Sequence, residues 1–131
     1  MKYQDLVDRA FEATKNAYIP YSNFAVGACI LLKNGEHIIG CNIENAAYGS
    51  AMCAERNAIY TAYCQGYKKE DIEAIAIVAD CEPLASPCGA CRQVLAELLH
   101  PNTPIVLANH KRHEITDIET LLPMAFTGDS L

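Results

Sequence analysis

Pro87-Cys88-Gly89-Ala90-Cys91 decides the fold together with Cys53-Ala54-Glu55, which precedes it in the chain. The spacing of the three cysteines suits one tetrahedral zinc ion. Each motif stands at the start of a predicted helix, so the fold must bring two helix starts together. Structural zinc sites close all four positions with side chains, whereas catalytic sites keep one for water. Three cysteines therefore predict a catalytic zinc site, and the adjacent Glu55 is left free to move protons.

Apolar residues recur at helical spacing in three segments. The first begins at Tyr3 and ends before Pro20, the second covers 53–65 and the third covers 87–99. Ser86 is a good N-cap and Pro87 a good first helical residue, which would place Cys88 in the first turn of the third helix. Thr116 and Glu119 predict a capping box for a short last helix.

Short apolar runs between these helices predict strands over 26–32, 37–42, 75–78 and 105–108. Asn34-Gly35 suits the tight turn of a hairpin between the first two runs. The last two runs are continuously apolar, as expected of strands covered on both faces. The pattern predicts an α/β fold with a sheet between helical layers.

The composition favours a small enzyme subunit of one domain over residues 1–131. The net charge is −6 and the basic residues form no long cluster, which disfavours a nucleic-acid partner. No apolar run is long enough for a bilayer and the N-terminus lacks signal-peptide features, so we expect no membrane association and a cytoplasmic location. The seven cysteines are an odd number, as expected of reduced thiols rather than disulfides.

Two local problems accompany the predicted zinc site. The charges of three thiolates and Zn²⁺ sum to −1, so the site needs compensating positive charge. The candidates are the two helix N-termini, Arg56 and Arg92. We favour Arg56 as a hydrogen-bond donor to the thiolates.

The second problem is geometric, because two residues along a helix span about 200° of rotation. Cys53 and Glu55 can therefore serve one site only in the first turn, with the pocket approached end-on.

Over nearly its whole length the sequence resembles the small homotetrameric cytidine deaminases, which act on free nucleosides. Four segments carry the resemblance: Pro20-Tyr21-Ser22-Asn23-Phe24-Ala25-Val26-Gly27-Ala28, Gly40-Cys41-Asn42-Ile43-Glu44-Asn45-Ala46-Ala47-Tyr48-Gly49, Cys53-Ala54-Glu55-Arg56 and Ser86-Pro87-Cys88-Gly89-Ala90-Cys91-Arg92-Gln93. The resemblance implies a three-layer α/β/α fold with a mixed, mostly five-stranded sheet. It also implies a homotetramer with shared active sites.

The same resemblance implies the chemistry. One Zn²⁺ per subunit would be held by Cys53, Cys88 and Cys91, and would activate water for attack on C4 of cytosine. Glu55 would protonate N3 and then the departing amine. The expected reaction converts cytidine and 2′-deoxycytidine to uridine and 2′-deoxyuridine plus ammonia, in pyrimidine salvage.

The resemblance further implies the substrate contacts. Asn42 and Glu44 would bind the ribose 3′-hydroxyl, and the Glu44 carboxylate would repel a phosphate, which favours nucleosides over nucleotides. Phe24 would contact the pyrimidine face. The remaining contacts are expected at a subunit boundary, from Ala46, Tyr48 and, out of a neighbouring subunit, Phe126.

Other interpretations stay open from the sequence. Cys81 could complete a closed Cys₄ site with the other three cysteines, which would make the chain a non-catalytic zinc module. A deaminase of blasticidin-type cytosine antibiotics would share the fold, although the Asn42 to Asn45 segment argues against it. The remaining thiols, Cys29, Cys41 and Cys64, are expected to be buried packing residues. The four histidines have no ligand-like spacing.

Overall fold

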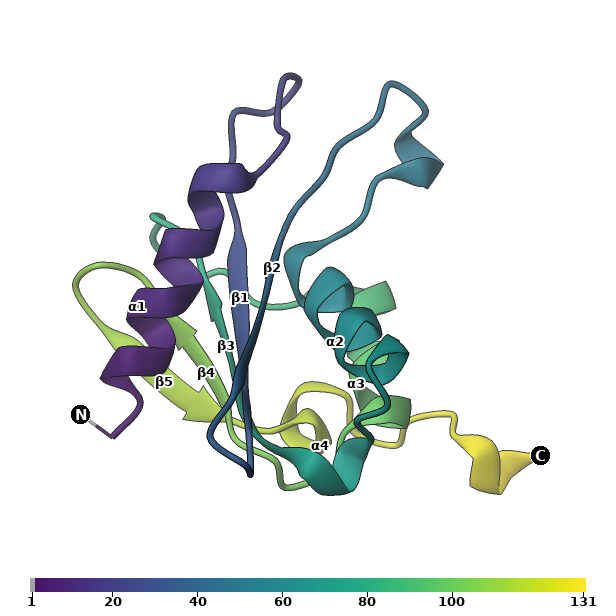
Figure 1. Ribbon diagram of the computed structural model, residues 1–131. Helices are drawn as coiled ribbons and strands as arrows, with labels where there is room; N and C mark the ends of the chain where they lie inside the picture. The colour runs from purple at the N-terminus through teal and green to yellow at the C-terminus, as the bar shows by residue number, and fades with distance from the viewer. Residues whose placement is uncertain (1) are drawn as a thin grey trace.

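The computed structural model describes residues 2–131, which form a central sheet with helices on both faces (Figure 1). The strands are β1 (Gly27–Leu32), β2 (His37–Cys41), β3 (Ile72–Val78), β4 (Ile105–Ala108) and β5 (His113–Thr116). The α-helices are α1 (Gln4–Ala13), α2 (Ala54–Cys64), α3 (Gly89–Leu98) and α4 (Ile118–Leu121), with 3₁₀ turns at Thr14–Asn16, Tyr48–Ser50, Lys69–Asp71 and Gly128–Ser130.

The sheet has the strand order β2-β1-β3-β4-β5, and only β3 and β4 of these neighbours run parallel. The predicted hairpin joins β1 to β2, with Gly35 at φ +90° in its turn. The connection from β3 to β4 passes through α3, as parallel neighbours require. The five-stranded mixed sheet is confirmed.

Two apolar cores separate the layers, one on each face of the sheet. Alternating residues of β3 point to opposite faces: Ile75 and Ile77 belong to the core under α2 and α3, whereas Ala76 and Val78 belong to the core under α1. Figure 1 shows α1 on one side of the sheet and α2 with α3 on the other. The three-layer prediction is therefore confirmed.

Helix α2 lies very close to β2, which positions its N-terminal end. A Cβ atom on Gly40 would lie 2.4 Å from the carbonyl oxygen of Ala54 and 2.7 Å from the amide nitrogen of Ala58. Ala54, Ala58 and Ala62 are fully buried. The small side chains here let α2, whose N-cap is Cys53, pack directly on the sheet.

The structure corrects several predicted boundaries. The first helix is shorter than expected, because α1 gives way to a 3₁₀ turn after Ala13. Helix α3 begins at Gly89, with Cys88 rather than Ser86 as its N-cap, and α4 is capped by the side chain of Asp117, which accepts a hydrogen bond from the Thr120 amide. The predicted capping box at Thr116 was therefore one residue early.

The fifth strand had no counterpart among the runs found in the sequence. Strand β5 lies at the edge of the sheet and is mostly exposed, so it carries no apolar alternation.

In the described part of the chain, no helix combines the length and apolar character needed to cross a bilayer.

Candidate active site

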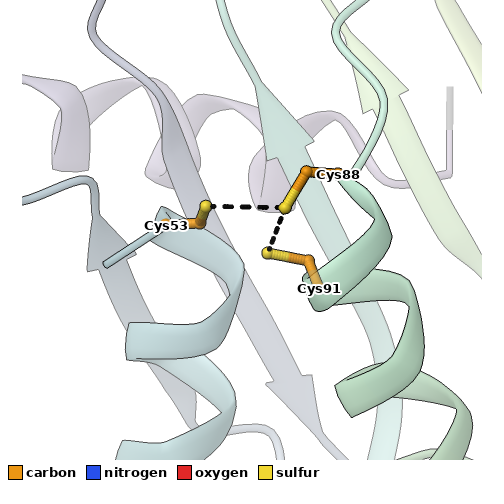
Figure 2. Close-up of side chains that lie close together, drawn as sticks. All are labelled: Cys53, Cys88 and Cys91. Carbon is orange, nitrogen blue, oxygen red and sulfur yellow. Dashed lines mark hydrogen bonds between the residues drawn. The ribbon is translucent and has the colours of Figure 1, made fainter. Parts of the chain in front are cut away.

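The structure brings the three predicted cysteines together between the starts of α2 and α3. Cys53 is the N-cap of α2, Cys88 is the N-cap of α3, and Cys91 lies in the first turn of α3. Figure 2 shows the three side chains converging from the two helices. The sulfur of Cys88 lies 3.9 Å from that of Cys53 and 3.5 Å from that of Cys91.

This group fits a zinc ion. Zn–S bonds of about 2.3 Å in a tetrahedron separate two sulfurs by about 3.8 Å. All three sulfurs lie within 4.8 Å of one another, and no other group of this kind occurs among the described residues. Cys81 lies outside it and contacts the Pro83 carbonyl oxygen instead. The described residues thus offer three sulfur ligands, which leaves one tetrahedral position for a non-protein ligand.

The surroundings of Cys53 favour its thiolate form. A hydrogen bond from Cys91 lowers the pKa of Cys53 most, and Arg56, whose Nη2 lies 3.4 Å from the Cys53 sulfur, lowers it further, so that it falls to about 5 despite partial burial. That same hydrogen bond, and then burial, raise the pKa of Cys91. Arg56 therefore occupies the predicted place as a donor to a thiolate.

Glu55 shares this pocket because of the way α2 begins. Cys53 has extended backbone (φ −75°, ψ 155°) and precedes the helix, so the 200° rotation expected within a helix does not separate it from Glu55. The Glu55 residue is only 4 % exposed. Burial raises the pKa of the Glu55 carboxyl above its usual range, and negative charge on Cys53 adds to the rise. A carboxyl with a raised pKa can exchange protons nearer neutral pH.

A pocket of about 240 Å³ opens beside these groups. Its lining includes Phe24, Asn42, Cys53, Glu55, Ser86 and Cys88. Two predicted substrate contacts, Phe24 and Asn42, therefore lie in the same pocket as Cys53, Cys88 and Glu55. Ser86 was not predicted as a pocket residue, although its position just before Pro87-Cys88 was a signal that could have found it.

Asn42 holds the segment that carries Phe24. Its Oδ1 accepts a hydrogen bond from the Val26 amide at 2.9 Å, and its Nδ2 donates one to the Phe24 carbonyl oxygen at 2.8 Å. An amide side chain has two donor hydrogens and two acceptor lone pairs, so Asn42 keeps one of each for a ligand.

The structure places Glu44 in a different hollow from Asn42. That pocket of about 390 Å³ is lined by Tyr21, Ser22, Glu44, Asn45, Tyr48 and Ala51. The Glu44 carboxylate accepts hydrogen bonds from the hydroxyl of Ser22 and from the amides of Tyr21 and Ser22, and these lower its pKa. Ala46 and Phe126 line neither pocket, so one copy of the chain does not unite all the predicted substrate residues.

The remaining cysteines and histidines lie apart from the sulfur group. Cys29 is buried, and burial raises its pKa to about 11, as expected of a packing thiol. Cys41 is partly buried, but Cys64 is exposed, so the prediction that Cys64 is a packing residue was wrong. Among the described residues no histidine joins a metal-type group.

Three sulfur ligands, an open position and a buried carboxyl beside them are the arrangement of a catalytic zinc site. The model of the family described as "Cytidine and deoxycytidylate deaminase zinc-binding region" matches residues 1–107, and this chain belongs to that family.

Individual relatives agree along the whole chain. A cytidine deaminase of Halalkalibacterium halodurans is 48% identical over 100% of this chain and 98% of its own length. One from Sporosarcina psychrophila is 44% identical over 100% of this chain and 96% of its own length. The crystal structure of cytidine deaminase from Burkholderia pseudomallei superimposes with a TM-score of 0.92 at 43% identity, covering 96% of this chain and 100% of that one.

Proposed function

We propose that this chain catalyses the hydrolytic deamination of cytidine and 2′-deoxycytidine in pyrimidine salvage. The reaction consumes one water, releases ammonia and leaves a carbonyl at C4 of the base. The observation that carries the proposal is the buried Glu55 in one pocket with Cys53 and Cys88, two of the three grouped cysteines, because it supplies a proton-transfer group that a structural zinc site does not need.

In this proposal Cys53, Cys88 and Cys91 hold one Zn²⁺ per subunit. Bound there, zinc would act as a Lewis acid that makes water nucleophilic near neutral pH. Glu55 takes one proton from the attacking water and passes it to N3 of the base. It then takes the second proton, from the hydroxyl formed on C4, and passes it to the amine, so that ammonia leaves and C4 becomes a carbonyl. Phe24 lies against the pyrimidine ring and fixes its orientation.

In this proposal the ribose 3′-hydroxyl is bound by Asn42 and by Glu44, which lines the second pocket. Asn42 retains hydrogen-bonding capacity for the 3′-hydroxyl, and the ionised Glu44 repels a phosphate on the sugar. We therefore infer a nucleoside substrate in preference to a nucleotide.

We also infer a cytoplasmic location, because the seven cysteines are free thiols and a reducing compartment keeps thiols free. Recovery of the native protein from another cell compartment would contradict this location.

The direct test is an absorbance assay of cytidine conversion together with a metal count on the purified protein. One zinc per chain and conversion of cytidine and 2′-deoxycytidine are expected, with cytidine 5′-monophosphate a much poorer substrate. A blasticidin-type antibiotic serves as the comparison substrate. Preference for that antibiotic, or zinc binding with no turnover of any cytosine nucleoside, would reject the proposal.

Arg56 is expected to tune the pH dependence of the reaction. Its guanidinium offsets negative charge on the thiolates through its contact with the Cys53 sulfur. Arg56→Gln should therefore raise the pH at which activity appears, measured as the acid limb of the kcat profile. Arg9→Gln, which breaks an exposed ion pair with Asp5 on α1, is the matched control. A profile for Arg56→Gln that overlies the wild-type profile would remove Arg56 from this role.

We further propose a homotetramer in which neighbouring copies complete each pocket. Tyr48 is 84% exposed and Phe126 is 61% exposed in one copy, so both are available to an adjacent chain. Figure 1 shows the C-terminal segment, in yellow, extending away from the sheet.

Subunit mixing tests whether Phe126 acts in a neighbour's pocket. Glu55→Gln and Phe126→Ala subunits should each be nearly inactive alone, but mixed tetramers should regain activity, because some pockets combine an intact Glu55 with an intact Phe126. Wild-type subunits mixed with Glu55→Gln subunits provide the reference curve. Activity that stays at the sum of the two separate variants after mixing would contradict a shared pocket.

A further inference from the structure

Arg92 uses its guanidinium in a different way from Arg56. It follows Cys91 in the first turns of α3 and has no carboxylate partner among the described residues. Instead it donates to three uncharged acceptors: Nε to the Pro87 carbonyl oxygen at 2.7 Å, Nη1 to the Leu121 carbonyl oxygen at 2.8 Å and Nη2 to the Ser86 hydroxyl at 3.1 Å. These acceptors belong to two segments far apart in the sequence.

The turn formed by Ser86, Pro87 and Cys88 needs such support. It ends an irregular connection that begins after β3 at Val78, and it carries both a pocket residue and a metal ligand. The Cys88 side chain makes no capping bond to α3, since its sulfur faces the other cysteines. In the described part of the chain, the side-chain hydrogen bonds to Ser86 Oγ and Pro87 O come from Arg92.

Arg92 also contacts the C-terminal part of the chain. Leu121 ends α4, and its carbonyl oxygen accepts from Arg92. The neighbouring Gln93 donates from Nε2 to the Phe126 carbonyl oxygen at 2.8 Å. Two consecutive side chains of α3 therefore fasten the segment from Leu121 to Phe126 to the helix that supplies Cys91.

We propose that Arg92 is a positioning residue that fixes the Ser86–Cys88 turn against the end of α4, and so sets the placement of the Cys88 sulfur and of the Ser86 pocket wall. It acts on the backbone beside the ligand, whereas Arg56 acts on a sulfur itself. A guanidinium presents several donors in a fixed plane, which allows three acceptors to be held in one arrangement. A lysine in its place keeps the charge but offers a single nitrogen.

The test compares Arg92→Lys with wild type in zinc affinity, measured by competition with a chelator. We expect an affinity loss of about 10–100-fold, the range seen when groups that orient metal ligands are removed. Substitution with Co²⁺ should also show shifted visible absorption bands, because these report the arrangement of the ligands. Tyr63→Phe is the matched control, since it removes one hydrogen bond to the same helix, at the Leu98 carbonyl oxygen, away from the cysteines.

A second variant separates positioning from a general loss of stability. Ser86→Ala removes one of the three acceptors. If the proposed function holds, this variant should raise KM for cytidine more than it lowers kcat. Wild-type zinc affinity and Co²⁺ spectrum in Arg92→Lys would overturn the inference, as would equal losses in Tyr63→Phe. If wild type fails to deaminate cytidine while Arg92→Lys still loses zinc affinity, the proposed function fails and the positioning role stands.

Discussion

Glu55→Gln is expected to lower kcat for cytidine by about 10²–10⁴-fold, the usual contribution of a positioned proton-transfer group. Glutamine matches the size of glutamate and keeps a hydrogen-bonding side chain, but it cannot accept and release a proton. The Glu55 residue is 4 % exposed, so bulk water has little access to replace it. Burial already holds the pKa of this carboxyl above its usual range, and removing the charge therefore costs the fold little.

Three measurements keep this result interpretable. The zinc content and the Tm of Glu55→Gln should match those of the wild type, since the three sulfurs are unchanged. Glu97→Gln makes the same substitution on the exposed face of α3 and should leave kcat unchanged. Normal turnover by Glu55→Gln with zinc bound would remove Glu55 from proton transfer and leave the proposed mechanism without its central group.

The parts of the site that could be predicted are those governed by ligand chemistry and local sequence. Cys88 and Cys91 are three residues apart, so one helix start presents both sulfurs, and zinc requires further ligands from elsewhere. Cys53 was the cysteine that also stood at a helix start, and the structure confirms that it joins them. The layered fold was predictable because apolar spacing differs between buried strands and covering helices.

The parts that could not be predicted depend on contacts between distant segments. No local pattern shows that the amides of Tyr21 and Ser22 hold Glu44, or that Arg92 reaches the carbonyl oxygen of Leu121. Strand β5 is defined by pairing with β4 rather than by its own exposed residues.

Cys91→Ser is expected to cost zinc affinity more than about 100-fold, since loss of a ligand should exceed the effect of losing a group that merely orients one. Cytidine deamination should be lost with the metal. The protein should also melt at a lower temperature, because a 100-fold excess of a ligand over its Kd stabilises the native state by about 2.7 kcal/mol and that linkage is lost with the ligand. Chelator competition, the absorbance assay with cytidine and Tm measure these three effects.

Two other cysteine variants decide between the catalytic site and the closed one. Cys64→Ser alters an exposed thiol outside the sulfur group and should leave zinc content, Tm and turnover unchanged. Cys81→Ser should do the same, because Cys81 contacts the Pro83 carbonyl oxygen rather than the other sulfurs. A loss of zinc in Cys81→Ser equal to that in Cys91→Ser would mean that four sulfurs close the site, which leaves no position for water and makes hydrolysis at this zinc impossible.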